Sequence, residues 1–140
     1  MSKDVIVLED NFDAVRDAVT GAMLMDAAKA GGNVVEGHAK INAGCGRPGL
    51  IMRLGTLVNS IITVAGKKFR TRAWAHIGTN IIYARIHELG GIIKGAFGIK
   101  DMIVHMPARP YLRPAMDEHE DDIKGAVETE IWRNLDKATK

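Results

Sequence analysis

The sequence predicts an α+β protein in which a small antiparallel sheet packs against a long N-terminal helix and a C-terminal helix. Three observations predict this fold class. Apolar residues recur at helical spacing near both ends of the chain, residues 69–77 alternate between apolar and polar side chains, and glycines or prolines separate the segments in between. The chain has 140 residues, 46% of them hydrophobic, which is enough to bury one core without disulfides or a structural metal.

The N-terminal helix is predicted to begin after a cap at Asp10 or Asn11 and to end before the glycine-rich segment 44–49. Its apolar stripe consists of Phe12, Val15, Val19, Ala22, Met23 and Ala27. Gly31 and Gly32 interrupt the pattern, and each costs about 1 kcal/mol relative to alanine in a helix. Because apolar residues continue beyond them, we expect the helix to pass through the glycine pair.

The sheet is predicted to contain three or four antiparallel strands drawn from residues 60–106. A β-branched run at residues 61–64 indicates the first strand, and residues 66–68 suit a hairpin turn. The alternating segment that follows is the clearest strand of the chain. One face of this strand would carry Arg70, Arg72, Trp74 and His76.

The middle glycines separate a short helix from a further strand. Residues 83–89 suit one or two helical turns that end at the pair Gly90 and Gly91. Residues 91–101 are expected to form a flexible loop or a long hairpin, with a short strand at residues 102–106. The loop exposes apolar side chains, so it is expected to become ordered against a neighbouring molecule.

Three prolines and a final helix complete the described pattern of the sequence. Pro107, Pro110 and Pro114 hold the segment extended, and Pro114 suits the first turn of a helix. The final helix is indicated by an acidic start, a basic end and the apolar stripe Met116, Ile123, Val127, Ile131 and Leu135. We therefore expect one domain over residues 1–140, with residues 1–10 as an N-terminal arm.

The charges are segregated along the chain, although the formal net charge is only +2. Residues 1–37 hold three basic and seven acidic residues, residues 38–113 hold twelve and two, and residues 114–140 hold four and eight. A basic middle between acidic ends can be neutralised within one molecule, between identical subunits, or by an anionic partner such as nucleic acid. The sequence leaves these three interpretations open.

No set of residues predicts catalysis, a cofactor or a metal ion, so we expect a protein that is not an enzyme. Gly44, Gly46 and Gly49 match the spacing of a dinucleotide-binding loop, but a helix precedes them where that motif requires a strand. The five histidines lack the spacing of metal ligands, and His119 with Asp122 fits an acidic first helical turn. A single cysteine and the lack of a long apolar run predict a chain that begins in a reducing cytoplasm, with no membrane span.

A basic group at the predicted second strand indicates an alternative function. Lys67, Lys68, Arg70 and Arg72 precede Trp74, and such a surface can contact phosphates while the aromatic ring stacks on a base. The alternative is therefore a small cytoplasmic nucleic-acid-binding protein that uses residues 67–76. A solvated outer sheet face would show the same pattern.

Three segments follow one another in an order that indicates a known family. They read G-T-L-V-N-S-I at residues 55–61, Y-A-R-I-H-E-L-G-G at residues 83–91, and M-P-A-R-P-Y-L-R-P-A at residues 106–115. With the long helix before them, the variable loop and the final helix, they resemble the virion-morphogenesis and tail-completion family of tailed phages and prophages. The resemblance covers most of residues 12–135.

The resemblance implies a structural protein of the virion neck or tail, without catalytic activity, made in the host cytoplasm. It implies a ring, hexameric like the symmetry of the tail, that completes the tail or joins it to the head. Connector and tail proteins would be its neighbours, and DNA would pass through it only as cargo. We expect subunit contacts at Phe97, Ile99, Arg109, Tyr111 and Arg113, because the prolines hold the two arginines in a preordered segment.

Overall fold

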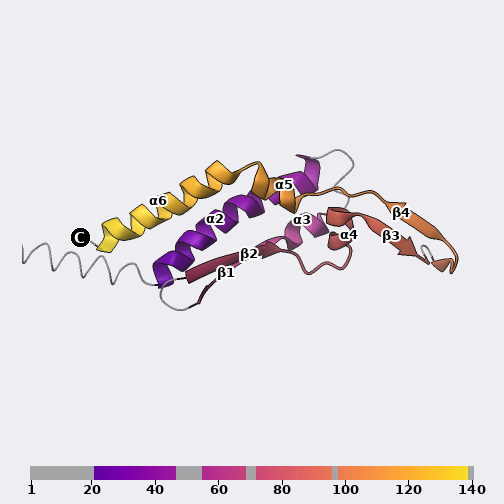
Figure 1. Ribbon diagram of the computed structural model, residues 1–140, viewed down its shortest axis with the longest axis horizontal. Coiled ribbons are helices and arrows are strands. Elements are labelled where there is room, and N and C mark those ends of the chain that lie inside the picture. The colour runs from indigo at the N-terminus through magenta and orange to yellow at the C-terminus, as the bar shows by residue number, and fades with distance from the viewer. Residues whose placement is uncertain (1–20, 47–54, 69–71, 96–97, 139–140) are drawn as a thin grey trace, which may run out of the picture. The chain divides into compact units, whose positions relative to one another are not determined.

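The structure is a computed structural model that describes residues 21–46, 55–68, 72–95 and 98–138 (Figure 1). The chain divides into two compact units. Unit 1 contains the chain up to Val34, residues 63–76 and residues 121–140, and unit 2 contains residues 35–62 and 77–120. The predicted arm at residues 1–10 and the predicted cap of the first helix lie outside the described residues.

Unit 1 has three layers, with the first part of helix α2 (Gly21–Ile41) in the middle (Figure 1). Helix α6 (Glu120–Ala138) packs on one side of it, where a Cβ atom on Gly31 would lie 2.8 Å from Val127 Cγ2 and 3.3 Å from Ile123 Cγ2. On the other side, the hydroxyl of Thr63 donates a 3.0 Å hydrogen bond to the carbonyl oxygen of Gly32. Gly31 lets α6 approach closely, and the prediction that the helix passes through the glycine pair is confirmed.

The third layer is the pair of strands β1 (Ile62–Lys68) and β2 (Arg72–Gly78). Exposed side chains alternate with partly covered ones over residues 62–65 of β1 and 72–77 of β2, which confirms the alternation predicted for the part of β2 that the structure describes. The ring of Trp74 lies over Gly66, where a Cβ atom would collide with it. The turn predicted at residues 66–68 is wrong, because β1 continues through Lys68.

Unit 2 surrounds a small core with short elements. These are the π-helical turn η1 (Asn42–Gly46), helix α3 (Thr56–Ser60), helix α4 (Ala84–Leu89), strand β3 (Gly91–Lys94), strand β4 (Ile103–Met106) and helix α5 (Leu112–Asp117). Strands β3 and β4 pair in antiparallel register, with Gly91 opposite Met106 and Lys94 opposite Ile103. The buried side chains of this unit are Val35, Ala39, Ala43, Leu57, Ile61, Ala84, Tyr111 and Ala115.

The α+β class is confirmed, but three details of the prediction are wrong. The strands form two separate two-stranded sheets within the described residues, because α4 and the turn at Gly90 separate β2 from β3. The single final helix is divided into α5 and α6. Met116, which was assigned to the apolar stripe of that helix, is exposed, so its match to the helical period did not indicate burial.

Candidate functional site

The segments at residues 83–91 and 106–115 form one interlocked structure in unit 2, and Glu88 is its centre. The Glu88 carboxylate accepts hydrogen bonds from the main-chain N–H groups of Tyr111 and Leu112 at Oε2 (2.7 and 3.0 Å) and of Arg113 at Oε1 (2.9 Å). The first N–H groups of a helix have no partner within it, and negative charge is favourable there. Glu88 of α4 therefore stabilises the beginning of α5.

Gly90 brings the two segments into contact. Its φ angle is +70°, a conformation that favours glycine, and a Cβ atom on it would lie 2.8 Å from the nitrogen of Ala108. The Gly90 N–H donates to the carbonyl oxygen of Ile86 at 2.8 Å and ends α4. The next hydrogen bond, from the Arg109 N–H to the His87 carbonyl oxygen at 2.7 Å, holds the proline segment against that helix end.

Two titratable side chains of this structure are kept from ionising by their surroundings. Tyr111 is only 1% exposed, and burial together with the Glu88 carboxylate raises its pKa to about 12. Burial and the positive charge of Arg109 lower the pKa of His87 below 6.5. His87 Nδ1 is buried with no hydrogen-bond partner among the described residues, and its ring stands edge-on to Tyr83 with 5.8 Å between centroids. Tyr111 belongs to the buried core of unit 2, and His87 is half-buried.

The five residues expected at subunit contacts are placed differently. Tyr111 is inside unit 2, so its side chain offers no surface to a second molecule. Arg113 and Ile99 are exposed, and Arg109 is half-buried. Phe97 lies outside the described residues. For Phe97, Ile99, Arg109 and Arg113, the subunit contact stays a prediction.

The hairpin of β3 and β4 carries exposed apolar side chains on both of its faces. All four residues of β3 are exposed, including Ile92 and Ile93, which point to opposite faces. Ile99 and Ile103 are also exposed, each by more than half of its surface. An isolated two-stranded hairpin is marginally stable in water, and exposed apolar patches mark interaction sites. We call Ile92, Ile93, Ile99 and Ile103 the apolar hairpin.

The basic residues considered for nucleic acid lie on β1 and at the start of β2. Lys67, Lys68 and Arg72 are exposed, and Arg70 lies outside the described residues. Lys68, Arg72 and Trp74 share one face of the sheet, while the strand alternation turns Lys67 to the other. Trp74 is 41% exposed and contacts the ring of His76 edge-on. Contact between this face and DNA stays a prediction.

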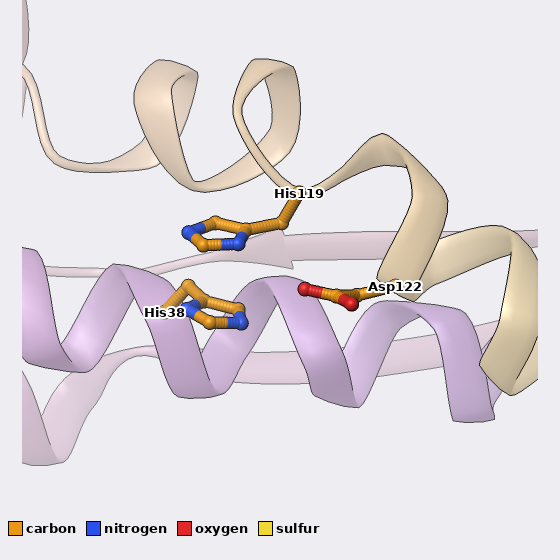
Figure 2. Close-up of side chains that lie close together, drawn as sticks. All are labelled: His38, His119 and Asp122. Atoms are coloured by element: carbon orange, nitrogen blue, oxygen red, sulfur yellow. The ribbon is translucent and has the colours of Figure 1, made fainter.

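Sequence spacing did not reveal one histidine pair in unit 2. Figure 2 shows the imidazole rings of His38 and His119 stacked, with centroids 3.4 Å apart and an angle of 11° between the planes. Asp122, also drawn there, follows His119 by three residues and belongs to unit 1. The two imidazoles are fewer ligands than a zinc site of three or four requires, so the pair alone does not assign a metal site. Only the tertiary fold brings residues so distant in sequence together.

Unit 2 also contains an apolar pocket of about 300 Å³, lined by Gly78, Thr79, Ile81, Ala84, Arg85, Glu88, Leu89, Tyr111 and Leu112. Its carboxylate, Glu88, is already bonded to the start of α5. Its phenol, Tyr111, is neutral at ordinary pH.

In the part of the chain that the structure describes, no helix has the length and apolar character needed to cross a bilayer.

The described residues define a small α+β protein whose distinctive features are exposed apolar and charged surfaces. The model of the phage virion morphogenesis family matches residues 36–132, more than half of the chain. The protein therefore belongs to the phage virion morphogenesis family, and the resemblance noted in its sequence is confirmed. No curated protein and no solved structure matches the chain. Membership supports a structural role in virion assembly and an association with the virion.

The family match includes the interlocked segments of unit 2. Within these motifs, Glu88 accepts the hydrogen bond from the Tyr111 N–H, and Gly90 leaves room for the main chain of Ala108. Sequence reasoning found the segments but not the hydrogen bonds between them. The available signal was the scarcity of carboxylates, since Glu88 and Asp101 are the only acidic residues among residues 38–113, which hold twelve basic ones.

Proposed function

We propose that the protein is a structural component of the phage neck or tail that forms an oligomeric ring, and that this ring completes the tail or joins it to the head. Membership of the virion morphogenesis family supports a role in assembly. The observation that carries the proposal is the apolar hairpin, whose isoleucines are exposed on both faces of two short strands. A neighbouring subunit or virion protein would cover them.

The free energy that the apolar hairpin can contribute favours a closed assembly over a simple dimer. Complete burial of an isoleucine contributes about 1.5–3 kcal/mol, and the four of the hairpin are already partly covered. Association of two proteins costs about 4–15 kcal/mol in lost freedom of motion. One hairpin contact therefore gives weak pairing, whereas a ring provides each subunit with two contacts.

The proline segment supplies a second, preordered contact. Glu88 holds the main chain of residues 111–113, and the Arg109 N–H is bonded to α4. Arg113 is exposed at this fixed position. A guanidinium on a segment that is already ordered loses little entropy when it binds a carboxylate of a neighbouring subunit.

The test is electron microscopy of particles made by a phage or prophage that lacks this gene, complemented with variants. Ile92→Lys with Ile103→Lys places charge on the apolar hairpin and is expected to yield filled heads and tails that do not join. Ile82→Lys is the matched control, because Ile82 is 97% exposed outside the hairpin, and it is expected to restore virions. Intact infectious virions without any of the protein would refute the proposed function.

A further inference from the structure

Helix α6 carries acidic and aromatic side chains on the side opposite its contact with α2. Trp132 is 70% exposed, and one turn away on either side stand Glu128 and Asp136, which are also exposed. The residues that face α2, Ile123 and Val127, lie on the other side of the helix. The same outer row begins near the start of α6. We call Asp121, Gly125, Glu128, Trp132 and Asp136 the acidic stripe.

The outer face of the β1–β2 sheet has the complementary character. Val64 and Trp74 are exposed at its centre, and Lys68 and Arg72 are exposed at the hairpin end. Neither strand contains an acidic residue. We call Val64, Lys68, Arg72, Trp74 and His76 the basic face.

The two surfaces do not meet within one molecule, because α2 lies between them in unit 1. Gly31 of α2 is in contact range of α6, and Gly32 accepts the hydrogen bond from Thr63 of β1. Helical period places the acidic stripe opposite Ile123 and Val127, and strand alternation places the basic face opposite Thr63, which is bonded to α2. Within unit 1, the two surfaces therefore do not neutralise each other.

Gly125 adds an independent observation about the acidic stripe. Among the described residues, a Cβ atom on this glycine would meet nothing within 4 Å, so no packing in that part of the chain requires it. Gly31 differs, because α6 occupies the space of its missing side chain. A glycine weakens the interior of a helix, and one on an exposed row beside Glu128 leaves room for another chain to approach closely.

We infer that the acidic stripe of one copy docks on the basic face of the next copy, in a head-to-tail contact that repeats around the assembly. The inference rests on the proposed function and adds two surfaces of unit 1 to the subunit contacts proposed for the apolar hairpin and Arg113. Each copy presents both surfaces, so the contact is heterologous and closes into a ring when the rotation allows it. Trp132 and Trp74 are the apolar anchors, and the charges around them set the register and disfavour a reversed orientation.

A charge-exchange experiment on the full-length protein tests the contact. Glu128→Lys with Asp136→Lys makes both surfaces of a copy basic, and Lys68→Glu with Arg72→Glu makes both acidic. Sedimentation equilibrium is expected to show association weakened at least about tenfold in each variant alone. An equimolar mixture is expected to associate again, because every contact in it pairs opposite charges. Asp26→Lys with Asp117→Lys is the control of equal charge change, and it should associate like the wild type.

Intrinsic fluorescence gives a second readout, because the chain has two tryptophans and the inference buries both. Their emission is expected to shift to shorter wavelength as the protein concentration rises. Gly125→Ala should weaken association without lowering stability, since its methyl group would stand in the contact. Circular dichroism confirms that each variant is folded.

Four results would overturn the inference. The first is a wild-type chain that stays monomeric up to about 1 mM. The second is unchanged association in both charge variants, and the third is a mixture that fails to recover. The fourth is salt-dependent binding of an oligonucleotide to the basic face, together with self-association that is unchanged in Lys68→Glu with Arg72→Glu. In each of these cases, a defect of particles that lack the protein would leave the proposed function standing.

Discussion

Replacing Glu88 by glutamine tests how α4 and α5 are held together. Each hydrogen bond to a charged group contributes about 1.5–3 kcal/mol, and Glu88 accepts three of them. Glutamine keeps one oxygen for the N–H groups of Tyr111 and Leu112 but turns its own NH₂ group toward the N–H of Arg113. We expect Glu88→Gln to lower the free energy of unfolding by about 2 kcal/mol and Glu88→Ala to lower it by about 4 kcal/mol. The loss in Glu88→Ala is smaller than the sum of three such hydrogen bonds, because the bond to Arg113 is exposed to water.

Urea unfolding followed by circular dichroism measures these differences, provided that the dependence on urea is the same in all variants. Glu128→Gln is the matched control, because Glu128 is exposed on α6 and the same change there is expected to alter stability by less than about 0.5 kcal/mol. A Glu88→Gln protein as stable as this control would refute the role of the carboxylate at the start of α5.

Three further predictions concern packing and pH. Gly31→Ala should lower the free energy of unfolding by about 1 kcal/mol, because its Cβ would lie 2.8 Å from Val127 Cγ2. Gly37→Ala should raise the free energy of unfolding by up to about 1 kcal/mol, because a Cβ there meets no described atom within 4 Å. A more stable protein in both cases would contradict the packing of α6 on Gly31. The pKa of Tyr111 is raised to about 12, so the unfolded chain loses the phenol proton at a lower pH than the folded chain does. The free energy of unfolding should therefore fall as the pH rises from about 10 to 12. Urea titrations of Tyr111→Phe should show no such fall. Because the pKa of His87 is lowered, the unfolded chain binds a proton more readily, so stability should decrease as the pH drops below 6.5; an equal decrease in His87→Leu would show that this residue is not the cause.

Local sequence patterns predicted helices and strands correctly where a residue type or a spacing favours a single backbone conformation. The exposed row of β2 followed from alternation alone, because successive side chains of a strand point to opposite faces. The end of α4 followed from Gly90, whose positive φ angle is available to glycine. Periodicity failed at Met116, since a residue can match the helical period and still face solvent when the helix stops and a new one begins.

The candidate site was only partly accessible from the sequence. The three segments that carry the family resemblance were visible as motifs, and the family match confirms the family they indicated. The reason for Glu88 was not visible, because its partners are main-chain groups more than twenty positions away. Tyr111 was expected at a surface, and its burial follows from α4 and α5 closing around it.

The amino-acid sequence by itself determined the α+β class, the positions of most helices and strands, the segregation of charge and the family. These properties depend on local backbone preference, on period and on composition, which act between near neighbours. Only the tertiary structure decided which strands pair, which glycine faces α6, and that α2 separates an acidic stripe from a basic face. Such choices depend on packing between segments distant in the chain, where the same apolar or charged residue can serve the core or the surface.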